Sequence, residues 1–363
     1  MNKTRVIAFY LPQFYPTPEN DEWWEPGFTE WTNVVRAQPL FKGHYQPRVP
    51  RELSFYDLRV PETRERQAEL AREAGIEGFC YWHYWFGDGK RLLDRVFREV
   101  VESGKPDFPF CLCWANHSWY KKTWDPNSPN KLLIAQTYPG IEDYKNHFFE
   151  MLPAFRDERY IRNSDGKLLF GIYDPKSFDD FKTFKNVWNT LAKENGLVGF
   201  EFYAYTPGKK VYEAALTHGY DRIVYEAIND TYYDSEVRRY SLEWFKIHLK
   251  ILFHKPIKLE SYSKYVSTAI KMFKKLPNTT PCIDPMFDHS PRSKGLGQIL
   301  DKNDPKLWGK LCREIRKDVE SNPNNPDNFI FIKAWNEWGE GNYMEPDSRF
   351  GKAYIEESGK AFK

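Results

Sequence analysis

The stretch that decides the fold is residues 329–346, FIFIKAWNEWGEGNYMEP. It opens with an apolar run, Phe329–Trp335, whose length and side chains are typical of a buried strand. Two glutamates, Glu337 and Glu340, follow directly among tryptophans and glycines. We expect the strand to end near residues 335–336, because Gly339 and Gly341 permit a tight turn after it. Such a turn brings both carboxyl groups into one pocket; the alternative is a helix start with solvent-facing glutamates.

Seven further runs of this kind occur along the chain, with helical patterns between them. One such pattern, Pro61–Ala74, has a proline at its start and Gly75 just past its end, as helices often do. Eight strands alternating with helices predict an α/β fold, the (β/α)8 TIM barrel. The alternative is a doubly wound sheet, but its Gly-x-Gly-x-x-Gly motif is missing after the first run. The seven runs are Val6–Leu11, Gly78–His83, Phe110–Ala115, Leu168–Tyr173, Gly199–Tyr205, Arg222–Glu226 and Pro281–Met286.

The composition fits one folded domain over residues 1–363. Hydrophobic residues make up 41% and aromatic residues 17% of the chain, which is enough for a large core. The 53 lysines and arginines nearly balance the 51 acids, so charge gives no reason to expect nucleic acid as a partner. The five cysteines are scattered and odd in number, which indicates buried free thiols. We find no signal peptide and no membrane-spanning segment, and we therefore expect a cytoplasmic location.

Two connections are longer than barrel loops usually are. Residues 12–60 are rich in Pro, Trp and Gly, and we expect them to form an ordered loop over the site, with Trp24, Trp31 and His44 near the substrate. Residues 230–280 contain helix-like SLEWFKIHLKILF and lysine-rich KYVSTAIKMFKK. We interpret this second segment as a solvated helical excursion; a contact with a membrane surface or a lipid-linked substrate is the alternative.

The active site of a barrel is built from the carboxyl ends of its strands. Aromatic residues, amides and a few acids fall at these ends, with no cluster of lysine or arginine for phosphates, and this pattern indicates a carbohydrate site. Gln13, Trp82, Tyr173 and Glu226 are among them. The substrate-binding candidates are Tyr10, His44, His83, Asn116, His117, Trp119, Tyr205, Asp288, Trp335, Asn336, Trp338 and Tyr343.

The sequence predicts no cofactor and no metal ion. The histidines are spread over different elements without a His-x-x-x-His spacing, so the residue types that hold zinc do not converge. The chemistry then falls to Glu337 and Glu340. Desolvation and mutual repulsion raise the pKa of at least one of two adjacent buried carboxyls. One protonated acid beside one base is what cleavage of a glycosidic bond requires.

Several motifs resemble the WbsX-like proteins, which are related to glycoside hydrolase family 99. They include FTEWTNV, GHYQPRVP, FPFCLCWAN, DGKLLFGIYDP, FDHSPR and AWNEWGEGNYMEPD, and the resemblance runs from Ile7 to Tyr354. It implies a (β/α)8 barrel, an oligosaccharide or polysaccharide substrate, and a place among bacterial surface-polysaccharide (O-antigen or capsule) enzymes. By resemblance to the endo-α-mannosidases, Glu337 would deprotonate the sugar 2-hydroxyl and Glu340 would protonate the leaving oxygen, with retention of configuration.

Two positions depart from the family pattern. His117 and Ala135 stand where such proteins often carry an acid, and either change can alter the sugar recognised or the reaction. WbsX-like proteins have also been described as glycosyltransferases. Among the possible functions, hydrolysis like that of family 99 ranks first. Transfer of a sugar in polysaccharide biosynthesis ranks second, and a non-catalytic glycan-binding barrel ranks third.

Overall fold

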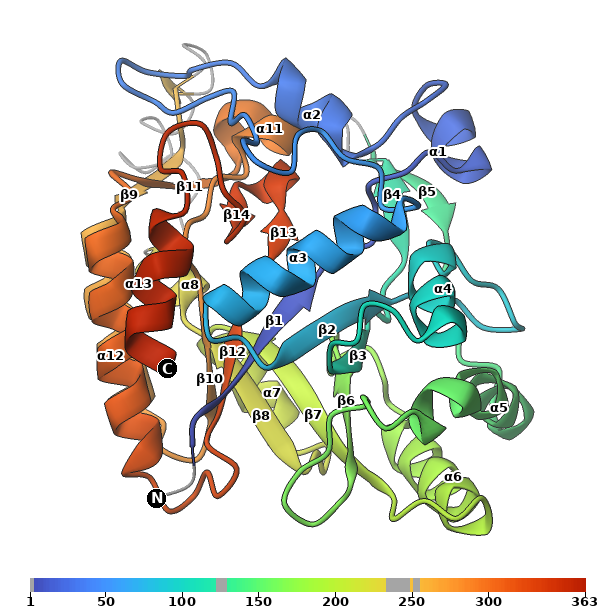
Figure 1. The fold of residues 1–363 in the computed structure, drawn as a ribbon. Coiled ribbons are helices and arrows are strands. Elements are labelled where there is room, and N and C mark those ends of the chain that lie inside the picture. The colour runs from blue at the N-terminus through green and yellow to red at the C-terminus, as the bar shows by residue number, and fades with distance from the viewer. Residues whose placement is uncertain (1–2, 122–128, 233–248, 251–254) are drawn as a thin grey trace.

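The protein is a closed barrel of eight parallel strands, as the sequence predicts (Figure 1). This computed structural model describes residues 3–121, 129–232, 249–250 and 255–363. The strands follow the order β1-β12-β10-β8-β7-β6-β3-β2 around the barrel. Their bounds are β1 Arg5–Tyr10, β2 Gly78–His83, β3 Phe110–Trp114, β6 Leu168–Ile172, β7 Phe200–Pro207, β8 Arg222–Glu226, β10 Thr280–Ile283 and β12 Phe329–Ile332.

All eight predicted runs are strands of this barrel. The clearest difference is at β12, which ends at Ile332 rather than near residues 335–336. The chain leaves the sheet there because residues 335 and 336 bond across to the first strand. Trp335 N donates to Phe9 O at 2.7 Å, and Asn336 exchanges two hydrogen bonds with the backbone of Leu11. These contacts join the last strand to the first and hold the following turn over the barrel.

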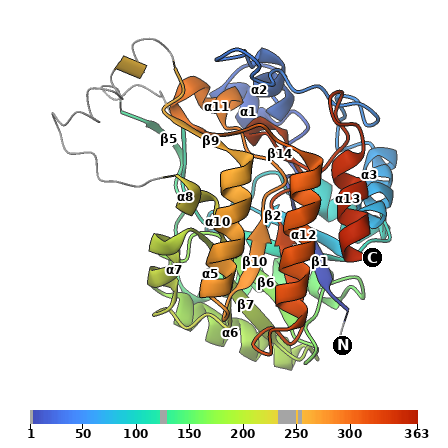
Figure 2. The same ribbon diagram turned by 90° about the vertical axis from the view of Figure 1, so that its left-hand side faces the viewer.

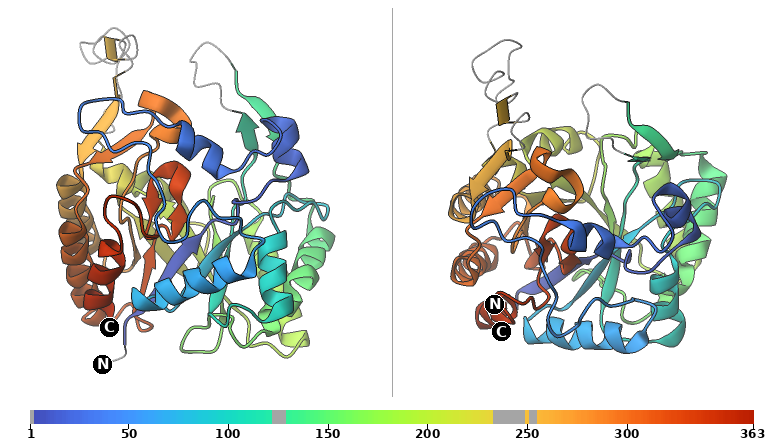
Figure 3. Two further views of the ribbon diagram at one scale, coloured as in Figure 1. Left: turned by 45° about the horizontal axis from the view of Figure 1, so that its top comes forward. Right: turned by 90° about the horizontal axis from the view of Figure 1, so that it is seen from above.

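A ring of helices surrounds the barrel (Figure 3). Helix α3 starts at Pro61, and Gly75 past its end has a φ of 78°, which confirms the predicted start and stop. Figure 2 shows α10, α12 and α13 together on one flank, where α12 packs against both neighbours. Within the part of the chain that the structure describes, the outer helices are α3 Pro61–Glu73, α4 Arg95–Ser103, α5 Ile141–Arg156, α6 Phe181–Glu194, α7 Lys209–Ala215, α10 Tyr262–Lys275, α12 Pro305–Glu320 and α13 Ala353–Phe362.

Shorter elements lie at the carboxyl ends of the barrel strands. The connection 12–60 carries two short helices and crosses the top of the barrel in the view from above (Figure 3, right). The turn after β12 is a small hairpin, β13–β14, in which Asn336 pairs with Tyr343. The shorter elements are α1 Pro18–Trp23, α2 Glu30–Arg36, β4 Trp119–Lys121, β5 Lys131–Ile134, α8 Ile228–Thr231, β9 Lys258–Ser261, α11 Ser290–Ser293, η1 Lys294–Leu296, β11 Gln298–Asp301, β13 Asn336–Glu337, η2 Trp338–Glu340 and β14 Asn342–Tyr343.

The connection 230–280 is only partly described. Its lysine-rich segment forms α10, whereas most of the predicted helix SLEWFKIHLKILF lies outside the described residues. No helix in the described ranges is long and apolar enough to cross a bilayer.

Aromatic side chains fill the core. Inside the barrel, Phe9 stacks on Trp82 with ring centroids 4.5 Å apart, and Tyr205 meets both rings edge-on. Between barrel and helices, Trp188 and Trp308 are completely buried. All five cysteines are buried and free, as predicted. Much of the high aromatic content therefore belongs to packing rather than to a site.

Candidate active site

A cavity of about 310 Å³ opens at the carboxyl ends of the strands, and Glu337 and Glu340 both line it. The hairpin β13–β14 with the turn η2 presents them, and Gly341 closes the turn with a left-handed φ of 54°. Gly339 is needed for close packing, because a Cβ there would lie 2.0 Å from Glu30 Oε2. The predicted turn therefore exists and points both carboxyls the same way.

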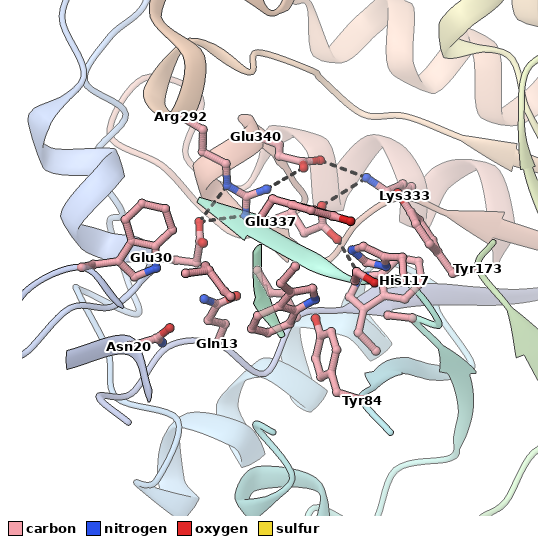
Figure 4. A pocket seen from close by; sticks show the side chains of 18 residues that line it. Gln13, Asn20, Glu30, Tyr84, His117, Tyr173, Arg292, Lys333, Glu337 and Glu340 are labelled. Atoms are coloured by element: carbon pink, nitrogen blue, oxygen red, sulfur yellow. Dashed lines mark hydrogen bonds and ion pairs between the residues drawn. The ribbon is translucent and has the colours of Figure 1, made fainter. Parts of the chain in front are cut away.

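Lys333 links the two carboxyls (Figure 4). Its Nζ lies 3.1 Å from an oxygen of Glu337 and 3.1 Å from an oxygen of Glu340. The two carboxyls also act on each other, because Glu340 raises the pKa of Glu337. The ammonium is buried, which favours its loss of a proton, but Glu337, Glu340 and Glu226 outweigh this and hold the pKa of Lys333 well above its usual value. Lys333 is thus a fixed cation rather than a nucleophilic amine.

Arg292 holds the second carboxyl from the other side. Its Nη1 lies 2.6 Å from Glu340 Oε1, and its Nη2 lies 2.9 Å from Glu30 Oε2. Glu30 belongs to α2, and Arg292 belongs to α11. Figure 4 shows the guanidinium between the two acids. The long connection 12–60 therefore supplies charge to the site as well as cover.

The two carboxyls differ in acidity. Burial raises the pKa of Glu337 to about 7; Lys333 acts against this and Glu340 adds to it. Burial also opposes ionisation of Glu340, but Lys333 and Arg292 outweigh it, so the pKa of Glu340 lies well below its usual value. Glu337 also accepts a 2.6 Å hydrogen bond from Trp82 Nε1. The unliganded pocket thus holds one readily protonated acid beside one persistent carboxylate.

The remaining walls are aromatic and amide side chains. Trp82, Trp119 and Tyr173 offer ring surfaces, and Trp24 stands 40% exposed at the rim. On the side of the N-terminal loop, the Nδ2 of Asn20 is buried without a hydrogen-bond partner in the described structure. Flat rings and free amide donors suit the C–H faces and hydroxyl groups of a sugar. The described residues contain no group of three or more His, Cys, Asp or Glu side chains arranged to hold a metal.

Four of the fourteen catalytic and substrate-binding candidates line this cavity: Glu337, Glu340, His117 and Trp119. Three other residues of the predicted strand ends line it as well: Gln13, Trp82 and Tyr173. His117 packs against Tyr173, with ring centroids 5.0 Å apart. Ala135, the second departure from the family pattern, is exposed on the surface and does not line the cavity. Of the three loop residues expected near the substrate, Trp24 lines the cavity, whereas Trp31 packs on Trp338 and His44 bonds to Asp288.

The structure does not bring the other ten predicted residues to the cavity. Side chains alternate between the inside and the outside of a barrel strand, so half of the strand-end residues point away from the site. Tyr10 donates to Gln67 of α3, and His83 lies 2.7 Å from His147 of α5, both on the outside. The remaining eight are Asn116, which bonds Tyr138; Tyr205, which bonds Glu226; His44 and Asp288, which bond each other; buried Trp335; Asn336, which bonds Leu11; Trp338, which bonds Glu345; and Tyr343, which bonds Asp347.

A family model described as "Glycosyltransferase WbsX" matches residues 6–358. The chain belongs to this family. Two curated relatives from Xanthomonas campestris pv. campestris, strains B100 and ATCC 33913, are both described as "Uncharacterized protein WxcX". Each is 33% identical over 367 residues, which is 98% of this chain and 49% of the relative. The chain thus spans about half the length of the curated relatives it matches.

Solved structures share the barrel. A "Glycoside hydrolase-like protein" has a TM-score of 0.63 and 13% identity, with 100% of this chain and 95% of that chain covered. The GH99 endo-α-mannosidase from Bacteroides thetaiotaomicron has a TM-score of 0.54 and 14% identity, with 99% and 97% covered. At these identities the likeness shows a common fold.

For this member of the WbsX family, sequence reasoning missed the basic half of the site. The sequence predicts no cluster of lysine or arginine for phosphates, and the two cations at the site, Lys333 and Arg292, are instead paired with carboxylates. Lys333 is four residues before Glu337 and belongs to the apolar run 329–335, whose pattern predicts a buried strand. Asn20 and Glu30 were missed because their place depends on how the long loop folds back, whereas Tyr84 lies one residue beyond the strand end at which the prediction stopped.

Proposed function

We propose that this protein is a carbohydrate-active enzyme that cleaves a glycosidic bond with the carboxyl pair Glu337 and Glu340. One observation carries the proposal: two carboxyls face one cavity, share the Lys333 ammonium, and have pKa values displaced in opposite directions. Such a pair supplies both the acid and the base of glycoside cleavage. The family description and the glycoside hydrolase folds among its structural neighbours agree with a reaction on sugars.

The proposed reaction retains configuration through the 2-hydroxyl of the substrate. As the resemblance implies, Glu337 removes the proton of the 2-hydroxyl while the oxygen of that hydroxyl attacks the anomeric carbon. Glu340 gives a proton to the departing oxygen. Water then opens the three-membered ring. The pKa directions in the unliganded pocket favour the opposite order, with Glu337 as the acid. For the proposed order to operate, the bound sugar must draw Arg292 or Lys333 away from Glu340.

The proposed substrate is an oligosaccharide or polysaccharide of the bacterial surface. Rings at the cavity and its rim (Trp24, Trp119 and Tyr120) can stack on sugars on either side of the cleaved bond. A lipid-linked glycan is the alternative form of this substrate, and a cytoplasmic location belongs to the same proposal. Fractionation of cells that express the whole protein checks the location.

The test of bond cleavage uses product analysis. Purified protein is incubated with surface polysaccharide from the source strain and with α-mannan oligosaccharides, and new reducing ends are measured. NMR of the first product reports its anomeric configuration. We expect release of reducing ends by wild type and none by a Glu337→Gln, Glu340→Gln double variant. Unchanged glycans in every reaction, with binding retained, would instead support the non-catalytic barrel.

Participation of the 2-hydroxyl has its own test. A substrate with fluorine in place of that hydroxyl cannot form the three-membered ring, and we expect it to bind without turnover. A covalent sugar adduct on Glu337 or Glu340, detected by mass spectrometry, would point to direct attack by a carboxylate. Turnover should also survive treatment with a chelator; activity that returns with one particular divalent ion would contradict the metal-free proposal.

Transfer of a sugar is the second candidate function, favoured by the family description "Glycosyltransferase WbsX". Hydrolysis and transfer start from the same attack and differ in the acceptor, which is water or a sugar hydroxyl. Adding an acceptor oligosaccharide to the assay distinguishes them. A transferase yields a longer glycan without new reducing ends, whereas a hydrolase releases a reducing end at every turnover.

A further inference from the structure

A second pair of buried carboxyls lies outside the substrate cavity. Glu226 is the last residue of β8, and Asp284 directly follows β10, the neighbouring strand. Their exposed fractions are 1% and 0%, and neither lines the cavity. The proposed reaction gives neither of them a role. Buried acids are costly unless each is paired or protonated, so their contacts decide what they do.

Hydrogen bonds account for all but one of their oxygens. Glu226 Oε2 accepts from Tyr205, while Glu226 Oε1 meets no N–H or O–H donor among the described residues. Asp284 accepts from Tyr265 at 2.8 Å and from Asn342 at 2.9 Å. The two carboxyls come from adjacent strands, and Glu226 raises the pKa of Asp284, so the two groups lie close enough to interact. A proton held between them relieves their repulsion and gives Glu226 Oε1 the partner that it otherwise lacks.

The pair is connected to Lys333 through short contacts. Lys333 N donates at 3.0 Å to the backbone oxygen of Ile283, the residue before Asp284. Asn342 bridges the two segments, because its Nδ2 donates to Asp284 and its Oδ1 accepts from Ala334 N at 3.0 Å. Glu226 also attracts the Lys333 ammonium. The ammonium is therefore attracted by Glu337 and Glu340 at the cavity and also by Glu226 of the buried pair.

We infer that Glu226 and Asp284 share one proton and act together as a positioning pair whose single negative charge sets the position of the Lys333 ammonium beside Glu337 and Glu340. With one proton, the pair carries a single negative charge, enough to keep the ammonium in place. A second negative charge would draw the ammonium away from the cavity. The catalytic consequence rests on the proposed function, whereas the shared proton does not.

The other groups facing this network are few in the described structure. Glu337, Glu340, Glu226 and Tyr173 act on Lys333. Glu226, Lys333 and Tyr265 act on Asp284, whose pKa burial and Glu226 raise well above its usual value. Burial holds the pKa of Tyr205 and Tyr265 well above the usual value as well, so both hydroxyls remain donors. The shared proton therefore persists at a pH where Glu337 has ionised.

Infrared spectroscopy tests the shared proton without any substrate. The spectrum is taken at about pH 9, roughly two units above the pKa of Glu337, where ordinary carboxyls have ionised. We expect a protonated carboxyl C=O band in wild type that disappears in Asp284→Asn and in Glu226→Gln. Glu345→Gln is the control and should keep the band. Absence of the band in wild type, or its survival in both variants, overturns the inference.

A milder variant covers the case in which these substitutions prevent folding. Tyr265→Phe removes only the hydroxyl that donates to Asp284, so the band should shift in frequency while the protein stays folded. An unshifted band in the folded Tyr265→Phe protein would also overturn the inference, because the band would then belong to another carboxyl.

The positioning role is read from the pH profile of kcat/KM. Asp284→Asn replaces the protonated carboxyl by a neutral amide, so the pair keeps a single negative charge. We therefore expect at most about threefold loss of kcat/KM. Glu226→Gln removes a negative charge that competes with Glu337 for the Lys333 ammonium, so the limb due to Glu337 should move to lower pH. A simple packing role would lower the rate without moving that limb. If wild type turns over no glycan, the proposed function fails while the infrared result still decides the shared proton.

Discussion

Among single residues, Lys333 sets the chemistry of the pocket more than either glutamate alone. Two carboxyls that interact directly would repel each other if both were ionised, and a shared ammonium makes their approach favourable. Arg292 touches only one of the pair, Glu340, and this asymmetry separates the two pKa values. The site thus distinguishes two chemically identical side chains by the placement of one guanidinium.

The first prediction assigns the roles of the two acids. An activated aryl glycoside needs no proton on its leaving group, so replacing the acid should spare it, while a substrate with a poor leaving group should lose about 10²–10⁴-fold in kcat/KM. If Glu340 is the acid, Glu340→Gln shows this difference and Glu337→Gln slows both substrates. The opposite pattern would support Glu337 as the acid and Glu340 as the base, the assignment that their pKa directions favour.

The pH dependence gives a second reading of the same variants. Glu340 raises the pKa of Glu337, so Glu340→Gln should bring that pKa below about 7. On the activated substrate, a base must be ionised, and the rate of Glu340→Gln should therefore rise with pH through the pKa of Glu337. A rate that falls with rising pH in this variant would show that Glu337 must be protonated and would reject its role as the base.

At the scale of elements, the hairpin β13–β14 and its turn depend on close contact with α2. The second prediction is that Gly339→Ala lowers activity, because its Cβ would lie 2.0 Å from Glu30 Oε2 and push that carboxylate off Arg292. The cost should be smaller in a Glu30→Ala background, with a coupling energy of about 0.5–3 kcal/mol in a double-mutant cycle on kcat/KM. Additive effects would mean that Glu30 and Gly339 do not communicate.

The hairpin is also anchored from behind by Glu345. Its carboxyl accepts hydrogen bonds from Tyr56, Gln67 and Trp338 at 2.8, 2.6 and 2.6 Å. The third prediction is that Glu345→Leu destabilises the fold by about 1–3 kcal/mol for each donor left unpaired. Glu345→Gln should cost less than Glu345→Leu. The side-chain oxygen of the new glutamine still accepts a hydrogen bond, and the Gln67 amide can turn so that its own oxygen accepts from the new nitrogen. Urea unfolding checks the order; equal losses would contradict it.

Across the whole molecule, the two ends of the barrel have separate tasks. The carboxyl end carries the cavity, while ion pairs at the amino end hold the strands together, as is usual in this fold. Arg222, at the start of β8, lies 2.6 Å from Glu201 of β7 and 2.7 Å from Asp327, which precedes β12. These side chains are nearly buried, so the network joins three parts of the barrel wall far from the site.

The fourth prediction separates stability from activity. Arg222→Met leaves the Glu201 and Asp327 carboxylates without their cation and should cost about 3–5 kcal/mol in the free energy of unfolding. The kcat of the protein that remains folded should stay close to wild type. Lys360→Met, which breaks an exposed surface pair with Glu357, is the control and should leave the free energy of unfolding close to that of wild type. A large loss of kcat in Arg222→Met would contradict the separation.

Local pattern was enough to predict the strands of the barrel. Each run is long enough to cross the sheet and apolar enough to be buried on both faces, and the turn after residue 335 followed from its glycines. Prediction of the site was less complete, because a residue at a strand end has two directions in which to point. Tyr10 and His83 sit at the predicted ends but face the helices α3 and α5.

The sequence by itself therefore determined the barrel and the turn that brings the two glutamates into one cavity, since periodicity and turn chemistry are local properties of the chain. Tertiary structure alone decided their electrostatics. Arg292 and Glu30 are 262 residues apart, and they meet at Glu340 only because the barrel closes and the loop 12–60 folds back across its top. The charge around a buried carboxyl depends on every group within several ångströms, and no local pattern encodes which distant segments will supply those groups.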